Sequence, residues 1–121
     1  MTLEQYNKFI EICAKLNHGY QSTAKKDIRR HNKAMEDLGT AFNQVKKDMS
    51  GAKAFYIELM EHESEDVRLN AAVHCFGLDI NIEQAKKTLQ GIIDSHPWGS
   101  FDAELCLERY EKEGSAGFQY E

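Results

Sequence analysis

Residues 62–79, HESEDVRLNAAVHCFGLD, decide the fold of this chain, because they combine a helix start with an unusually apolar helix. Ser64 is a residue type that caps helix N-termini, and Glu65 and Asp66 fall in the first turn, where the helix dipole favours negative charge. Apolar side chains then cover most of the circumference, and small alanines allow neighbouring helices to approach closely. The stretch predicts a helix between two layers, which Gly77 ends.

The same stretch contains metal-ligating and acid/base residue types, but not in the spacing that such sites need. Helical metal ligands usually stand three or four residues apart, whereas His62 and His74 are twelve residues apart. The chain has five histidines and no nucleophile motif. We therefore expect no metal, no cofactor, no catalytic residue and no enzymatic activity, and we expect His31 and His74 to be core or core-edge residues.

The order of residues in this stretch resembles the HEAT repeat in its short, phycobilin-lyase-like variety. The matching residues are an acid, Val67, Arg68, Ala71, Ala72 and, in a following helix, Ala85 and Leu89. The resemblance implies that Arg68 reaches neighbouring carboxylates or helix-end carbonyls. One repeat cannot bury both of its faces, so the helices before and after it must act as neighbours.

Five further helical patterns surround this stretch. They cover residues 3–18, 25–49, 52–62, 82–94 and 101–113. The predicted N-terminal signals are a capping box of Thr2 and Gln5, and caps at Asn81 and Ser100. Gly114 ends the last helix, and we expect a mobile tail in which Phe118 and Tyr120 are able to dock. The fold class is all-α: about six helices in a HEAT-like α-α superhelix with a long second helix, in a single domain over residues 1–121.

Apolar residues at intervals of three and four predict the buried face of each helix. In the first helix they are Leu3, Tyr6, Phe9, Ile10, Cys13 and Leu16. In the second they are Ile28, His31, Met35, Leu38, Phe42, Val45 and Met49. The third buries Phe55, Tyr56, Leu59 and Met60, and the fifth Ile82, Ala85, Leu89, Ile92 and Ile93. The apolar stripe of the second helix favours packing within the chain, and a homodimer that packs through this stripe is the alternative.

Composition places the chain among ordinary globular proteins. Hydrophobic residues make up 41% and charged residues 29%, and the apolar runs are too short to span a membrane. Cys13, Cys75 and Cys106 are an odd number of cysteines at wide spacings, which favours reduced thiols. The N-terminus lacks the pattern of a secretory signal. We therefore expect a cytoplasmic protein with no membrane partner.

The net charge of −5 conceals an asymmetry between the two halves. Residues 1–53 contain ten basic and six acidic side chains, whereas residues 54–121 contain five basic and fourteen acidic ones. The two halves therefore present fields of opposite sign to a partner.

The chain as a whole resembles a bacterial family of small helical proteins that is catalogued only as a domain of unknown function. The resemblance rests on YNKFIEICAKLNHGYQSTAKKDIRRHNKAMEDL, on the stretch quoted first and on GSFDAELCLERYEKEG. It covers nearly the whole chain, but its motifs are architectural. Members often lie near polymorphic toxin genes, including contact-dependent growth-inhibition systems, and look like immunity proteins there. The resemblance thus implies an immunity protein that binds a cognate toxin, and a scaffold without chemistry of its own fits that role.

The acidic half indicates where such a toxin would bind. A basic nuclease domain would be attracted by these acids, which mimic phosphate charge. Trp98 and Phe101, after the single proline, are either interface anchors or a plug of the core between the last two helices. The predicted partner-binding residues are Glu61, Glu63, Glu65, Asp66, Asp94, Trp98, Phe101, Asp102, Glu104 and Glu108.

Two other functions remain open at this point. The basic patch at residues 25–33, KKDIRRHNK, suggests a helical nucleic-acid-binding or scaffold protein, although no aromatic residue lies among the bases and the whole chain is acidic. A small lyase-like accessory protein rests only on the name of the repeat.

Overall fold

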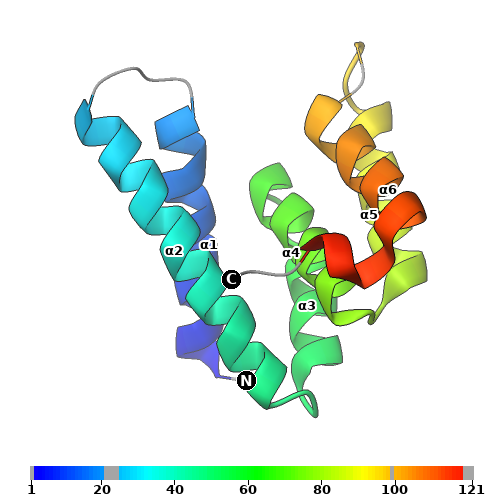
Figure 1. Ribbon diagram of the computed structural model, residues 1–121, viewed down its shortest axis with the longest axis horizontal. Helices are drawn as coiled ribbons and strands as arrows, with labels where there is room; N and C mark the ends of the chain where they lie inside the picture. Colours follow the sequence, from blue (N-terminus) through cyan, green and yellow to red (C-terminus); the bar gives the residue numbers. More distant parts are fainter. Residues whose placement is uncertain (1, 21–24, 99, 119–121) are drawn as a thin grey trace. The chain divides into compact units, whose positions relative to one another are not determined.

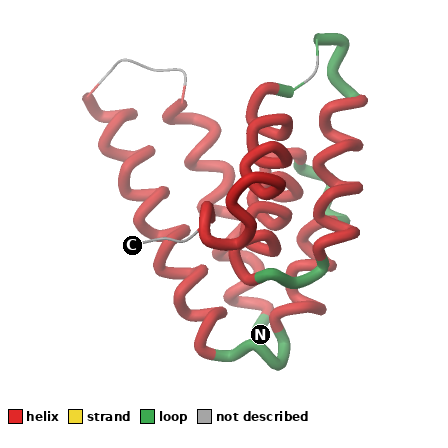
Figure 2. The backbone as a smooth tube through the Cα atoms, turned by 45° about the vertical axis from the view of Figure 1, so that its right-hand side comes forward, coloured by secondary structure: helices red, strands yellow, loops and turns green. Residues whose placement is uncertain are grey.

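The computed structural model describes residues 2–20, 25–98 and 100–118, and it confirms the all-α prediction. Within these residues there are six α-helices, one 3₁₀-helix and no strand. The helices are α1 (Leu3–Tyr20), α2 (Lys25–Lys47), α3 (Ala52–Met60), α4 (Glu65–Leu78), α5 (Ile82–Asp94) and α6 (Phe101–Glu113), followed by the 3₁₀-helix η1 (Gly114–Phe118). Figures 1 and 2 show that α1 and α2 of the first unit run side by side in opposite directions.

The chain forms two compact units, and the boundary between them in the sequence lies between residues 52 and 53. The first unit holds α1 and α2, and the second holds nearly all of α3 together with α4, α5, α6 and η1. This division almost coincides with the change from the basic to the acidic half of the sequence. The expectation of a single domain over residues 1–121 stays a prediction.

In the first unit α1 packs against α2. The capping box is confirmed: the Gln5 Oε1 atom accepts from the Thr2 N–H at 2.8 Å, and the Gln5 N–H donates to Thr2 Oγ1 at 3.2 Å. His31 lies at the edge of the core as predicted, with its Nδ1 atom 3.3 Å from the carbonyl oxygen of Leu16. The structure places the end of α1 at Tyr20, slightly later than the sequence predicts.

The predicted buried faces of α1 and α2 are only partly correct. Phe9, Cys13, Leu38, Phe42 and Val45 are buried as predicted. The predictions at four positions are wrong, because these side chains are exposed: Leu3, Ile28, Met35 and Met49. Two buried residues were missed, Ile12 and Ala34. Each real buried stripe is therefore rotated from the predicted one, and it is absent near the ends of the helices.

In the second unit α4 is the central helix and contacts α5, α6 and η1. Its buried residues include Val67, Ala71, Ala72, His74, Cys75 and Phe76, which confirms a helix that is enclosed on most sides. The alanines present little side chain, so the neighbouring helices come close. The predicted buried residues of α3, and Ala85, Leu89 and Ile92 of α5, are buried as well.

His74 is a core residue, as the sequence predicts. Its side chain is fully buried, and its Nδ1 atom shares a hydrogen bond of 2.8 Å with the Tyr56 hydroxyl of α3. The two rings meet edge to face, with centroids 5.4 Å apart. Desolvation lowers the pKa of His74 to about 3, so the imidazole is neutral at physiological pH.

The turn between α4 and α5 differs from the predicted one. Gly77 lies within α4, and the helix instead ends with Asp79 in the left-handed region at φ 57°. The Ile80 N–H bonds to the Cys75 carbonyl and the Asp79 N–H to the Phe76 carbonyl, which is the Schellman pattern. Asp is among the few residues that tolerate this conformation, so it replaces the expected glycine.

Two of the three predicted N-cap residues occupy the N-cap position, but their side chains do not make the capping hydrogen bond. Ser64 and Asn81 both precede a helix, and neither side chain makes a capping hydrogen bond. Asn81 instead donates from Nδ2 to the Lys53 carbonyl at 3.1 Å, which ties the start of α5 to α3. Ser100 caps α6 as predicted, accepting from the Ala103 N–H.

The C-terminal segment forms η1 through Phe118, so the predicted mobility is wrong over residues 115–118, whereas the predicted docking of Phe118 is confirmed. Gly114 ends α6 at φ 62° as predicted, and η1 then turns back onto α4. The buried Phe118 ring lies 5.5 Å from that of Phe76, which stacks on Tyr110 at 4.4 Å. The prediction for Tyr120 lies outside the described residues. Apolar burial by Phe118 thus orders a segment whose composition suggests mobility.

The cysteines are reduced, as predicted. Cys13 and Cys75 are buried, and Cys106 is half-buried. Burial raises the pKa of Cys75 to about 12 and that of Cys106 to about 11, so both are thiols at neutral pH. Across the helices that the structure describes, none has the length and apolar character needed to cross a membrane.

Candidate functional site

Three helix ends converge at one corner of the second unit. The start of α4, the end of α5 and the start of α6 meet there, and the Nε2 atom of His96 lies 2.6 Å from Oε1 of Glu65. We call this the acidic corner and define it as Glu65, Asp66, Asp94, Trp98, Phe101, Asp102 and Glu104. Of the residues predicted to share a surface, Asp66 of α4 and Asp102 of α6 lie near enough to interact although they are far apart in the sequence.

The carboxylates of the acidic corner influence one another. The pKa of Asp66 is raised, first by partial burial and then by the negative charges of Glu65 and Asp102. Glu65 belongs to α4 and Asp102 to α6, so this effect shows that the acids of two helices share one local field. A surface with accumulated negative potential attracts cationic partners and steers their approach.

Arg68 shapes the connection that precedes the corner. Its Nη1 atom donates to the carbonyls of His62 at 2.9 Å and Glu63 at 2.8 Å. His62 accepts from the Ser64 N–H through Nδ1 at 3.0 Å. The implied role of Arg68 at helix-end carbonyls is therefore confirmed, and His62 has a structural role. Glu61 and Glu63 are exposed in this connection.

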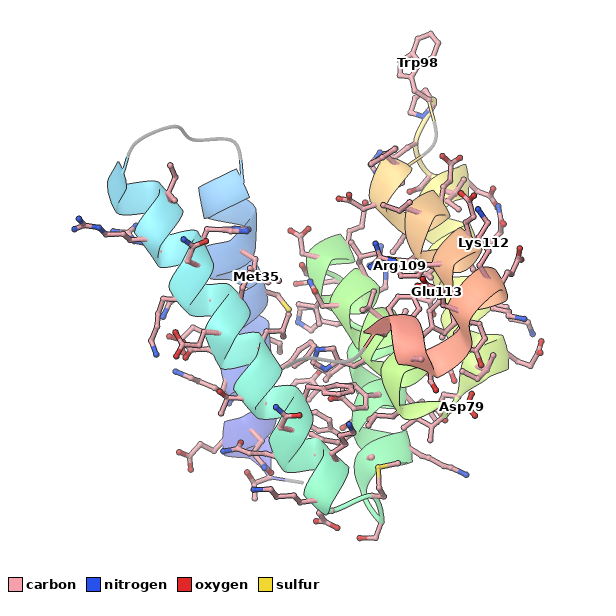
Figure 3. The ribbon with its side chains drawn as sticks, in the orientation of Figure 1. Met35, Asp79, Trp98, Arg109, Lys112 and Glu113 are labelled. Carbon is pink, nitrogen blue, oxygen red and sulfur yellow. The ribbon has the colours of Figure 1, made fainter. Side chains whose placement is uncertain are left out.

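Trp98 is not a plug of the core. Its side chain is 97% exposed and projects from the turn between α5 and α6, well away from the helices (Figure 3). Phe101, the first residue of α6, is 75% exposed. Of the two alternatives raised by the sequence, only the exposed position is observed. Exposed tryptophans are frequent anchors of protein interfaces, so the observed position keeps Trp98 a candidate contact residue.

Glu108 differs from the other predicted acids, because it is paired. Its Oε1 atom lies 2.7 Å from the Nζ atom of Lys112, and this bond lowers the pKa of Glu108. Asp94 accepts a hydrogen bond from Gln90 Nε2 at 2.9 Å and remains exposed at the end of α5. Pairing weakens the net field of Glu108, so the acidic corner is centred on the helix ends rather than along α6.

Two features of this surface were not predicted from the sequence: the bond of His96 to Glu65 and the exposure of Leu105. The bond between His96 and Glu65 joins residues thirty-one positions apart, and no local pattern indicates it. Leu105 is 39% exposed although it is apolar. Its position four residues after Phe101, on the same helical face, is a signal that was available.

We expect the acidic corner to be measurable through Trp98, which is the chain's single tryptophan. Relative to N-acetyltryptophanamide, caesium should quench its fluorescence more and iodide less, by about twofold at low ionic strength, because negative potential concentrates cations. In 0.5 M salt the difference between caesium and iodide quenching should shrink. Salt at this concentration reduces the Debye length to roughly a few ångströms and screens the acidic field. In the variant Asp102→Lys/Glu104→Lys the preference should reverse. Equal quenching by both ions would show that Trp98 lies outside the acidic field.

The basic patch at residues 25–33 is only partly described. Arg29 and Arg30 are exposed on α2, whereas Lys33 pairs with Asp37 at 2.9 Å. The side chains of Lys25 and Lys26 lie outside the described residues. A nucleic-acid or scaffold role for this patch therefore stays a prediction.

No group of three or more histidine, cysteine, aspartate or glutamate side chains in the described ranges is arranged to hold a metal ion. Among families of known proteins, a family model described as "Domain of unknown function (DUF2019)" matches residues 4–111. No curated protein and no solved structure matches the chain. The match confirms the resemblance to a domain of unknown function, and the link to immunity proteins stays untested.

Proposed function

We propose a function for this chain, which belongs to the family described as "Domain of unknown function (DUF2019)": it is an immunity protein that binds and neutralises a cognate toxin domain. The observation that carries the proposal is Trp98, which is 97% exposed on the turn between α5 and α6, the helices that carry Asp94 and Asp102. Aromatic side chains of this kind supply much of the binding energy of protein interfaces.

Charge selects the class of toxin in this proposal. Nucleases bind phosphates through basic clefts, and a surface of carboxylates on a rigid scaffold competes for the same clefts. The convergence of Glu65, Asp66 and Asp102 supports this, because carboxylates from two helices act at one place. Neutralisation then consists of covering the nuclease active site by protein–protein contact, without any chemistry by the immunity protein. The proposed setting is the bacterial cytoplasm, in contact-dependent growth inhibition.

Affinity capture followed by a growth assay tests the proposal. The tagged protein is retained from the cytoplasm of its own bacterium at moderate salt, and its partner is identified by mass spectrometry. The partner produced alone should arrest growth, and production of this protein with it should restore growth. A stoichiometric partner that leaves growth unaffected would overturn the immunity role.

Charge reversal should slow the association with such a partner. In the variant Asp94→Lys/Asp102→Lys/Glu104→Lys the association rate constant at low salt should fall about tenfold or more, because steering is lost. Helix content and melting temperature should stay the same, since all three side chains are exposed.

The matched control reverses three exposed acids outside the acidic corner, Glu36, Glu83 and Glu111. It carries the same change of net charge and should retain most of the rate. If both variants slow association equally, the effect comes from net charge and not from the acidic corner. An unchanged rate in both would remove the electrostatic part of the proposal.

A further inference from the structure

Two exposed apolar side chains lie on one face of α6, and the exposed Trp98 stands in the turn three residues before the helix. Phe101 and Leu105 stand four residues apart, so they are neighbours on the helix surface, and they are 75% and 39% exposed. The opposite face of α6 is turned inward, with Ala103 buried and Cys106 half-buried. We call Trp98, Phe101 and Leu105 the α6 stripe. Single exposed apolar residues are ordinary, but two on one helical face with an exposed tryptophan three residues before them are not.

Carboxylates border this stripe on both sides. On a helical projection Glu104 lies on one side of Phe101 and Asp102 on the other. Both are exposed, and neither forms an ion pair within the described part of the chain. An apolar line with an acidic border fits an apolar groove with a basic rim, in the way that an amphipathic helix enters a groove.

We propose that α6 itself is the recognition helix: Trp98, Phe101 and Leu105 insert into an apolar groove, rimmed by lysine or arginine, on a protein partner. The assignment deepens the proposed function and rests on it only for the identity of the partner as a toxin. It adds Leu105 to the binding residues and defines the partner's surface.

The border charges argue against other occupants. Nucleic acid and anionic lipid surfaces repel Asp102 and Glu104. A symmetric contact of two copies through the same stripe would bring the acids of both copies together. A protein groove with cations at its rim is the occupant that satisfies both the apolar and the charged residues.

Site-specific cross-linking tests this assignment. The photoreactive residue p-benzoylphenylalanine is placed at Leu105 and, as a control, at Lys87, which is exposed on α5. We expect a cross-linked protein partner from position 105 and none from position 87. The identified partner is then purified and titrated against the wild-type protein, Phe101→Ala, Leu105→Asp and the control Lys87→Ala.

Loss of an anchor residue should raise Kd about 30-fold or more, whereas Lys87→Ala should leave it within about twofold. Unchanged thermal melting shows that the variants are folded. The assignment is overturned if position 105 gives no cross-link, if the product is a second copy of this chain, or if phosphatidylcholine vesicles bind the stripe instead. A partner that binds through α6 but does not arrest growth would refute the proposed function and leave this assignment intact. If Leu105→Asp neutralises the toxin as well as the wild-type protein does, the assignment of α6 as the recognition helix is refuted and the proposed function stands.

Discussion

The variant Phe76→Ala should lower the free energy of unfolding by about 3–5 kcal/mol, the range for removing a buried phenylalanine ring. Phe76 is fully buried in α4, and its ring contacts both Tyr110 of α6 and Phe118 of η1. Removal leaves a cavity among three elements that cannot easily collapse, because they also pack against one another. Denaturant unfolding followed by circular dichroism at pH 7 measures the change.

Phe101→Ala is the matched control, since the same atoms are removed from a side chain that is 75% exposed. It should change the free energy of unfolding by no more than about 0.5 kcal/mol. Comparison of the two variants separates the effect of burial on the free energy of unfolding from the effect of replacing a phenylalanine. Similar losses in both would mean that Phe76 does not lie in the core of the second unit.

Stability should also fall when the pH is lowered from 7 to 5, by about 2 kcal/mol through His74 alone. Burial lowers the pKa of His74 to about 3 in the folded protein, whereas histidine in an unfolded chain titrates near its ordinary value of 6.5. Below pH 6.5 the unfolded state therefore binds a proton that the folded state does not. The stabilisation is complete above pH 6.5 and is lost progressively as the pH falls toward 3.

His74→Gln removes the titrating group and keeps a polar side chain near Tyr56, so its stability should vary little between pH 7 and 5. Urea titrations of both proteins at each pH give the comparison. Asp66 acts in the opposite direction at lower pH: its raised pKa means that the folded state binds a proton more readily there, which adds stability as the pH falls through that pKa. Identical pH slopes in the two proteins would show that His74 is not buried and neutral.

Much of the fold followed from periodicity and capping signals in the sequence. The six helices, the enclosed α4 and the burial of His74 were predicted, because a helix that is apolar on most sides has few places to lie. The points at which the buried stripes end were not predicted. Ile28 and Met49 extend the apolar spacing of α2 beyond the part that has a neighbour to pack against, and spacing alone does not show where a neighbour ends.

Local rules also failed where tertiary contacts decide the conformation. Gly77 has the residue type that ends helices, but it is buried inside α4, and Asp79 adopts the left-handed conformation instead. The Tyr110 hydroxyl donates to Oδ1 of Asp79 at 2.7 Å, which supports this turn from α6. A contact across thirty-one residues has no local signature.

The acidic corner was foreseen residue by residue but not in its geometry. Charge counting indicated that the acids would dominate the second half, and the residue types of Trp98 and Phe101 suggested anchors. The bond between His96 and Glu65, which joins the Trp98 turn to α4, depends on the packing of α4, α5 and α6. Leu105 was assigned no role because apolar residues in a helix are expected to be buried.

The position of Phe118 has a consequence for the order in which the second unit is completed. Its contact with Phe76 spans forty-two residues, so it is far less local than the turn joining α4 to α5. During synthesis α4 and α5 emerge from the ribosome while η1 is still to be made. The Phe76 ring can stack on Tyr110 once α6 has been made, but its contact with Phe118 can form only after the chain has been extended through η1. We therefore expect closure of the aromatic core to be a late event in folding.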